Sequence, residues 1–194
     1  TTGSDNVSYG SQALYSNTTA TNNSAFGRQA LCKNTTGGAN TALGAFALCA
    51  NTTASNNIAI GNSSMKVNTT GYINTSAGNN SMKNNTTGAD NNAVGNQVLK
   101  FNTTGYQNTA MGTFAGRSNT EGYANAIYGY NAMVTNQTGS NNVAIGTNSL
   151  AANTTASNNT AVGGGALASN TTAISNTGIG NSAGSDVTTG KENT

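Results

Sequence analysis

The sequence lacks the residue types on which most catalytic and metal-binding sites depend. It contains no histidine, tryptophan or proline, only two cysteines, and only 6% charged residues. Its five acidic residues are spread along the chain and form no repeated cluster: Asp5, Asp90, Glu121, Asp186 and Glu192. Catalysis by paired carboxylates and coordination of a metal ion both need such a cluster. The sequence therefore predicts no enzyme activity, no catalytic residue, no cofactor and no metal site.

Low charge and short apolar runs exclude further classes of protein. A net charge of +2 at pH 7 is too small to favour nucleic acid as a partner. No apolar run approaches the length of a membrane span, and no signal-peptide pattern is present, so we expect no membrane insertion in this segment. Low hydrophobicity alone would suggest disorder, but disordered segments usually carry high charge and keep no strict register.

What the chain does have is a period of 17 residues that never slips. Each repeat opens with asparagine and carries glycine four residues later, from Gly10 to Gly180. Stacked copies of one such unit predict a parallel β-solenoid, here a single repeat array over residues 1–194. The eleven full repeats start at Asn6, Asn23, Asn40, Asn57, Asn74, Asn91, Asn108, Asn125, Asn142, Asn159 and Asn176, and Asn193 opens another.

Two columns of the repeat supply nearly all the large apolar side chains. Counted from the first asparagine, position 4 carries residues such as Leu43 and Ile60, and position 9 carries Leu31 and Leu48. Positions 3 and 8 are mostly alanine or serine. Because neighbouring strand residues point to opposite faces, we expect positions 4 and 9 to face an apolar interior. The small residues would then form flat outer surfaces that another chain could approach closely.

Glycine and asparagine mark the corners of each predicted coil. The glycine at position 5 is expected to separate two short strands. An Asn-Thr-Thr-Gly or Asn-Thr-Thr-Ala sequence, as at 34–37 and 51–54, is expected to form the second corner, because asparagine tolerates a left-handed backbone. Stacking would align the asparagines into amide ladders. One coil buries little apolar surface relative to the entropy of ordering it, so we expect an oligomer, with a trimer favoured.

The repeats resemble a known family. Residues 159–167 read Asn-Thr-Ala-Val-Gly-Gly-Gly-Ala-Leu, and residues 142–150 read Asn-Val-Ala-Ile-Gly-Thr-Asn-Ser-Leu. These are similar to the YadA-like head repeats of trimeric autotransporter adhesins and to the Asn-Thr-Ala-Val-Gly-x-x-Ala-Leu repeats of phage tail fibres. The resemblance implies a left-handed parallel β-roll, a homotrimer, and attachment at a virion or cell surface. Because capping repeats are absent, we also expect an excerpt of a longer fibre.

Four basic residues share position 10 of successive repeats and form a basic stripe: Lys66, Lys83, Lys100 and Arg117. Like charges about 4.8 Å apart repel by about 1 kcal/mol per pair in water, less with salt, so long side chains on a solvated edge tolerate this spacing. One interpretation is therefore a solvated edge. The other is a binding stripe for acidic polysaccharide or lipid phosphate.

Other candidate residues also fall in shared columns. Tyr72, Tyr106 and Tyr123 occupy position 16 and are either exposed loop residues or stacking platforms for sugars. Cys32 and Cys49 share position 10 of adjacent repeats, close enough on stacking for a disulfide, with free thiols as the alternative.

The second corner raises two alternative functions. Its N-x-Thr sequons either form a structural ladder or, in a glycosylating host, carry glycans on an extracellular filament. Its threonine column suggests an ice-binding surface, although adjacent threonines point in opposite directions and the column lies on a corner. The sequons start at Asn17, Asn34, Asn51, Asn68, Asn85, Asn102, Asn136, Asn153 and Asn170. The threonines are Thr18, Thr35, Thr52, Thr69, Thr86, Thr103, Thr154, Thr171 and Thr188.

From these features we expect a structural and adhesive fibre segment, exposed outside the cell on a virion tail fibre or a cell-surface adhesin. The expected partners are further copies of the chain, as a trimer or an end-to-end filament, and surface glycans bound along the basic stripe. Affinity would then come from shallow contacts repeated along a fibre and multiplied by valency.

Overall fold

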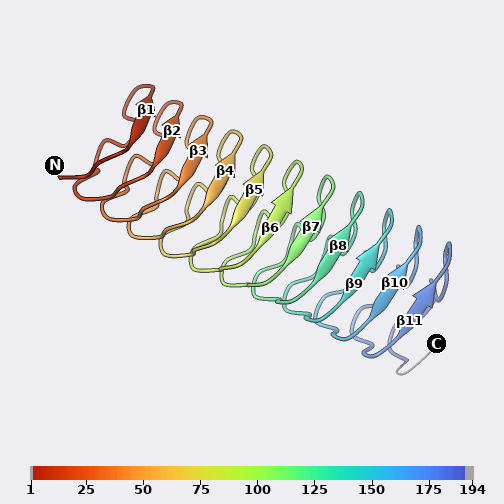
Figure 1. The fold of residues 1–194 in the computed structure, drawn as a ribbon. Coiled ribbons are helices and arrows are strands. Elements are labelled where there is room, and N and C mark those ends of the chain that lie inside the picture. The colour runs from red at the N-terminus through yellow and green to blue at the C-terminus, as the bar shows by residue number, and fades with distance from the viewer. Residues whose placement is uncertain (1, 191–194) are drawn as a thin grey trace.

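The computed structural model describes residues 2–190, which form one parallel β-solenoid (Figure 1). Glu192 and Asn193 lie outside the described residues. One sheet of eleven short strands runs the length of the stack in chain order, and the two ends of the chain lie at opposite ends of it. The strands are β1 (Val7–Tyr9), β2 (Ser24–Phe26), β3 (Thr41–Leu43), β4 (Ile58–Ile60), β5 (Thr75–Ala77), β6 (Asn92–Val94), β7 (Thr109–Met111), β8 (Ala126–Tyr128), β9 (Val143–Ile145), β10 (Thr160–Val162) and β11 (Thr177–Ile179).

Strand pairing follows the sequence period. Val7 pairs with Ser24, and Thr160 pairs with Thr177, each 17 residues further along. Every strand therefore repeats the position of its predecessor, and identical repeat positions lie above one another. The predicted parallel β-solenoid is confirmed.

The apolar side chains of position 4 face outward, so the prediction that they line the interior was wrong. Leu43 is 49% exposed and Met111 is 50% exposed. The central residue of each strand, position 3, points inward instead, and Ala42 is fully buried. Position 9 does face the interior as predicted, since Leu31 and Leu48 are fully buried.

The interior has room for one large side chain between the position-3 and position-9 columns, which explains the alanines. In the coil after β7, position 9 is Gly116 rather than leucine, and the next position 3 is Ile127 rather than alanine. A Cβ on Gly116 would lie only 2.7 Å from Ile127 Cδ1 and 2.9 Å from Leu99 Cδ2. Ile127 thus fills the space that glycine leaves open. In the other coils, except the last one with Gly184, leucine or methionine at position 9 fills this space, and only a small residue fits opposite.

The predicted second strand does not form, and the alanine column at position 8 is not an outer surface. Positions 6–11 form a turn, and Ala30 and Leu31 are both fully buried although they are adjacent. Strict alternation fails because Gln29 and Leu31 adopt left-handed conformations, with φ of 58° and 50°. The small-residue columns therefore pack inside their own chain.

Two ladders of buried asparagines run along the interior. At position 12, Asn51 Nδ2 donates to Asn34 Oδ1 at 2.8 Å. At position 1, Asn91 Nδ2 donates to Asn74 Oδ1 at 3.1 Å. The ladders fix the stacking of the coils that carry the surface residues described below.

Candidate ligand-binding surface

The turn after each strand brings positions 7 and 10 to one surface. In the coil that follows β7, the Arg117 amide donates to the Phe114 carbonyl oxygen at 3.1 Å. One coil earlier, Gln97 and Lys100 occupy the same two positions. The surface is therefore built from two adjacent columns, of which sequence analysis singled out only the basic one.

Lys100 and Arg117 share one acceptor. Lys100 Nζ donates to Gln97 Oε1 at 3.2 Å, and Arg117 Nε donates to the same oxygen at 3.3 Å. A neutral amide oxygen thus holds two cations from neighbouring coils side by side. Among residues 2–190, no carboxylate forms an ion pair with either of them.

Aromatic rings surround these two cations. Lys100 Nζ lies 5.1 Å and Arg117 Cζ lies 5.3 Å from the ring centroid of Phe101. Arg117 Cζ also lies 5.7 Å from the ring of Phe114, which contacts Tyr130 edge-on at a centroid distance of 6.0 Å. Cation–π contacts of this kind hold long side chains in place while their charge stays open to solvent.

The positive charges of the stripe act on one another. Partial burial lowers the pKa of Lys100, and the charges of Arg117 and Lys83 lower it further. An anion bound nearby would relieve this repulsion. The arrangement therefore favours an acidic ligand over a neutral or cationic one.

At this place the surface is hollowed into a groove of about 350 Å³, lined by Gln97, Phe114, Arg117, Asn131 and Val134. Arg117 is the only residue of the basic stripe among these lining residues. The contribution of position 7 was not predicted from the sequence, because the residues at this position vary from coil to coil. The signal present in the sequence is an amide or aromatic residue three positions before Lys83, Lys100 and Arg117, although serine stands at this place before Lys66.

The N-terminal end of the stripe is arranged differently. Lys66 Nζ lies 5.0 Å from the ring centroid of Phe46, and Arg28 Cζ lies 4.5 Å from the same ring. Arg28, which sequence analysis did not single out, therefore shares an aromatic partner with Lys66. The four basic residues thus occupy the same position in successive coils, but the side chains around them differ from one end of the stripe to the other.

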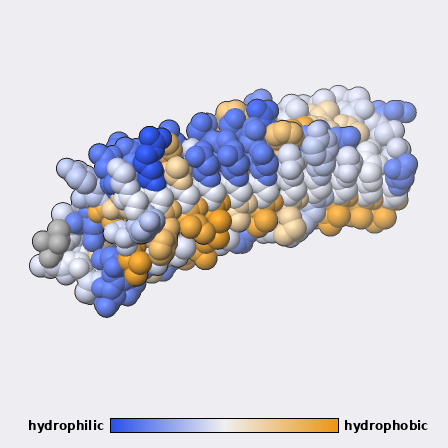
Figure 2. Space-filling view, turned by 90° about the horizontal axis from the view of Figure 1, so that it is seen from above, coloured by the Kyte–Doolittle hydropathy of each residue, from blue (hydrophilic) through white to orange (hydrophobic). Residues whose placement is uncertain are grey.

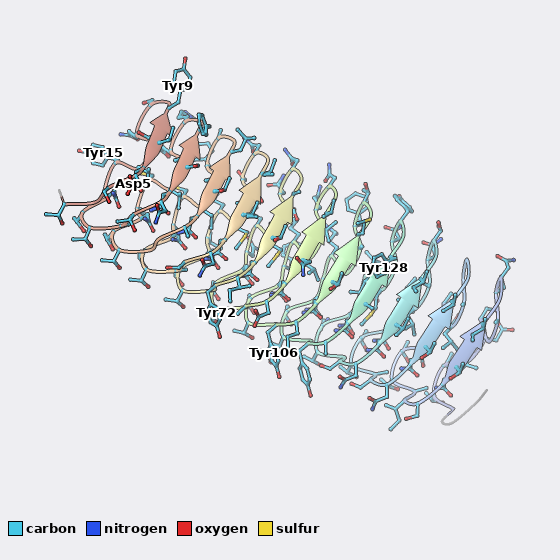
Figure 3. All side chains as sticks on the ribbon, viewed as in Figure 1. Asp5, Tyr9, Tyr15, Tyr72, Tyr106 and Tyr128 are labelled. Carbon is cyan, nitrogen blue, oxygen red and sulfur yellow. The ribbon has the colours of Figure 1, made fainter. Side chains whose placement is uncertain are left out.

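The three tyrosines lie apart from the groove. Tyr106 and Tyr123 stack in parallel with ring centroids 4.9 Å apart, whereas Ala89 separates Tyr72 from Tyr106. Tyr72 and Tyr106 project from the same side of the stack (Figure 3). The tyrosines are exposed, but none of them lines the groove.

Cys32 and Cys49 carry free, half-buried thiols on adjacent coils. Burial raises the pKa of the Cys49 thiol, and the neighbouring Cys32 raises it further by charge repulsion and a side-chain hydrogen bond. The two thiols therefore influence each other's ionisation, and the disulfide stays a prediction.

The structure gives the sequon asparagines an internal role. Asn51 and Asn68 are fully buried, and the Asn68 amide nitrogen donates both to Asn51 Oδ1 and to the Gly71 carbonyl oxygen. Only Asn17, at the first turn, is partly exposed. A glycan would have to be attached to the amide nitrogen of these asparagines, which in the folded coil is buried and hydrogen-bonded. The structure therefore does not favour the glycan-coated filament.

The corner threonines also use their hydroxyl groups internally. Thr35 Oγ1 donates to the Thr52 carbonyl oxygen at 3.1 Å, and Thr86 Oγ1 donates to Thr103 at 3.0 Å. These hydroxyls link neighbouring coils rather than facing water as a free array. The ice-binding alternative therefore gains nothing from this column, and a thermal-hysteresis assay would test it directly.

Comparison of the chain with protein-family models, with curated proteins and with solved structures found no match. Within residues 2–190, no group of three or more metal-ligating side chains comes together. No helix in the same range could cross a membrane. The site must therefore be interpreted from its own geometry.

Proposed function

We propose that this chain is a non-enzymatic segment of an extracellular attachment fibre, in a virion tail fibre or a cell-surface adhesin. The observation that carries the proposal is the outward column, meaning the position-4 side chains on the exposed face of the sheet. Phe26, Leu43, Ile60, Val94, Met111 and Ile145 are all between 39% and 50% exposed. Such a continuous apolar column is typical of a surface that another chain covers.

Further copies of this chain are the partners that fit the outward column. Eleven strands about 4.8 Å apart give a column about 50 Å long, and identical copies carry the same spacing of side chains. Hydrophobic residues form a row along one edge of the face seen in Figure 2, beside a hydrophilic band. We propose a homotrimer of left-handed β-rolls whose outward columns face one another. An end-to-end filament of single solenoids is the rival assembly.

Assembly through the outward column leaves the basic stripe free for attachment. The stripe lies in the turn after the strand, and its side chains are half-buried rather than covered. Three copies along a fibre would repeat each shallow contact, so weak individual contacts would add to useful affinity. We propose acidic surface glycans as the target.

Binding of the quadruple variant K66S/K83S/K100S/R117S to cells or to immobilised acidic polysaccharide tests this attachment. Surface changes of this kind are expected to cost less than about 0.5 kcal/mol of stability each, so the fold should persist. Binding should fall, and wild-type binding should weaken as salt is raised. Binding unchanged in the variant would leave the stripe as a solvated edge and the chain as a spacer.

A further inference from the structure

We infer that the groove lined by Gln97, Phe114, Arg117, Asn131 and Val134 binds a single sugar ring bearing a carboxylate, of the hexuronate type. This inference rests on the proposed attachment function and narrows it to one site and one ligand class. It uses residues from the turns after three successive strands, β6, β7 and β8, so the site exists only when the coils stack.

The size of the groove fits one ring rather than an extended chain. Its volume of about 350 Å³ is at the small end of the range of about 300–1,000 Å³ that ligand pockets occupy. Phe114 and Val134 supply apolar lining, and Gln97 and Asn131 supply amides. A pyranose ring combines these needs, with an apolar face for an aromatic ring and hydroxyl groups for amides.

Arg117 supplies the charge that selects a carboxylate. Its Nε donates to Gln97 Oε1 at 3.3 Å, which leaves the two terminal nitrogens of the guanidinium for a ligand. Two parallel N–H groups match the two oxygens of a carboxylate. Gln97 thus fixes the guanidinium without neutralising its charge. The same Gln97 Oε1 accepts from Lys100 Nζ at 3.2 Å, which keeps the second cation close to Arg117.

The ring and the cation are both needed. An inorganic anion would pair with Arg117 but make no apolar contact with Phe114. A neutral sugar would pack on Phe114 but bring no negative charge to the guanidinium. Partial burial lowers the pKa of Lys100, and the neighbouring charges of Arg117 and Lys83 lower it further, which agrees with an excess of positive charge beside the groove. A hexuronate satisfies both requirements at once.

Saturation-transfer NMR and titration of the intact chain with sodium glucuronate, methyl glucoside and inorganic phosphate test the inference. Glucuronate should bind at least about tenfold more tightly than either of the other two, because each lacks one of the two contacts. R117Q should lose glucuronate binding. F114N should weaken it, and asparagine already occupies the same repeat position at Asn131 and Asn148.

The matched control is K33S, which removes an exposed lysine that belongs neither to the basic stripe nor to the groove. It should leave glucuronate binding within about twofold of wild type after salt screening. Equal binding of methyl glucoside would overturn the role of the carboxylate, and equal binding of phosphate would reduce the groove to an anion site. A loss in K33S as large as in R117Q would show that glucuronate is held by nonspecific charge attraction only, and would overturn the inference.

The outcomes separate this inference from the proposed function. Loss of cell attachment in the quadruple variant, without glucuronate binding by the wild-type chain, would overturn the groove and leave the attachment proposal intact. In the opposite outcome, R117Q abolishes glucuronate binding but the quadruple variant attaches to cells as well as wild type. That result would support the groove and contradict the attachment proposal. R117Q keeps the test valid if F114N fails to fold, because Arg117 is half-exposed.

Discussion

Asn74 and Asn85 donate to the same acceptor: the Nδ2 atoms of both lie 2.9 Å from the carbonyl oxygen of Gly88. One asparagine belongs to each interior ladder, so this carbonyl joins the two ladders within the coil. The same junction recurs at Ala54, which accepts from Asn40 and Asn51. The interior is therefore held by a continuous amide network as well as by apolar contacts.

The first prediction concerns this network. In N85A, Asn68 Oδ1 would lose its donor and Asn102 Nδ2 would lose its ladder acceptor, each at 2.8 Å in the native chain. Buried polar groups left unpaired cost about 1–3 kcal/mol each. We expect N85A to lower the free energy of unfolding by about 3 kcal/mol.

Urea unfolding followed by circular dichroism measures this change. The control is N92A, which removes an exposed asparagine on the outer face of β6 and should cost less than about 0.5 kcal/mol. Equal stability of N85A and N92A would show that the ladder contributes little.

The second prediction concerns Gly116 and Ile127, where the usual large residue at position 9 and small residue at position 3 are reversed. In G116L, the new side chain would overlap Ile127 Cδ1, and the left-handed φ of 57° adds strain. In I127A, the loss of a buried side chain should cost about 2–5 kcal/mol. The double variant G116L/I127A restores the pattern of most other coils, so it should be more stable than either single variant.

Thermal unfolding of the four proteins in this cycle measures the coupling. Purely additive losses would contradict the conclusion that the two residues share one interior space.

The third prediction concerns the two thiols. Because the pKa of Cys49 is raised, less of this thiol is ionised at neutral pH, and its alkylation by iodoacetamide should be slow and should accelerate as pH rises. Mild oxidation should join Cys32 and Cys49 within one chain. Thiol titration should then fall from two per chain to none without a change in molecular mass of the assembly. C32S is the control, and chains joined between molecules would contradict the predicted pairing.

The period of the sequence predicted the stack and the ladders, because identical residues 17 apart can only align if each repeat is one layer. It did not predict which side of the strand faces inward. The alternation rule assumes extended backbone, and the left-handed Leu31 and Leu48 break it. Gly116 opposite Ile127 was visible in the sequence as a paired exception, but its meaning required knowing that both columns point inward.

The basic stripe was predicted from its column, but the groove was not. A groove depends on the side chains of three successive coils, and position 7 holds glutamine, phenylalanine and asparagine at Gln97, Phe114 and Asn131. No period marks such a set. The surface residues that differ between otherwise identical coils are therefore the ones that form the candidate binding site.

The mass of the assembly in solution tests the central claim, that the outward column joins copies of this chain into a fibre. Light scattering after size-exclusion chromatography at micromolar concentration should give three chains per particle. I60T should shift the particle toward monomer, whereas I174T, which alters an isoleucine of similar exposure outside the column, should not. A folded, monodisperse monomer would contradict the account, and particles of growing length that I60T leaves unchanged would favour end-to-end filaments.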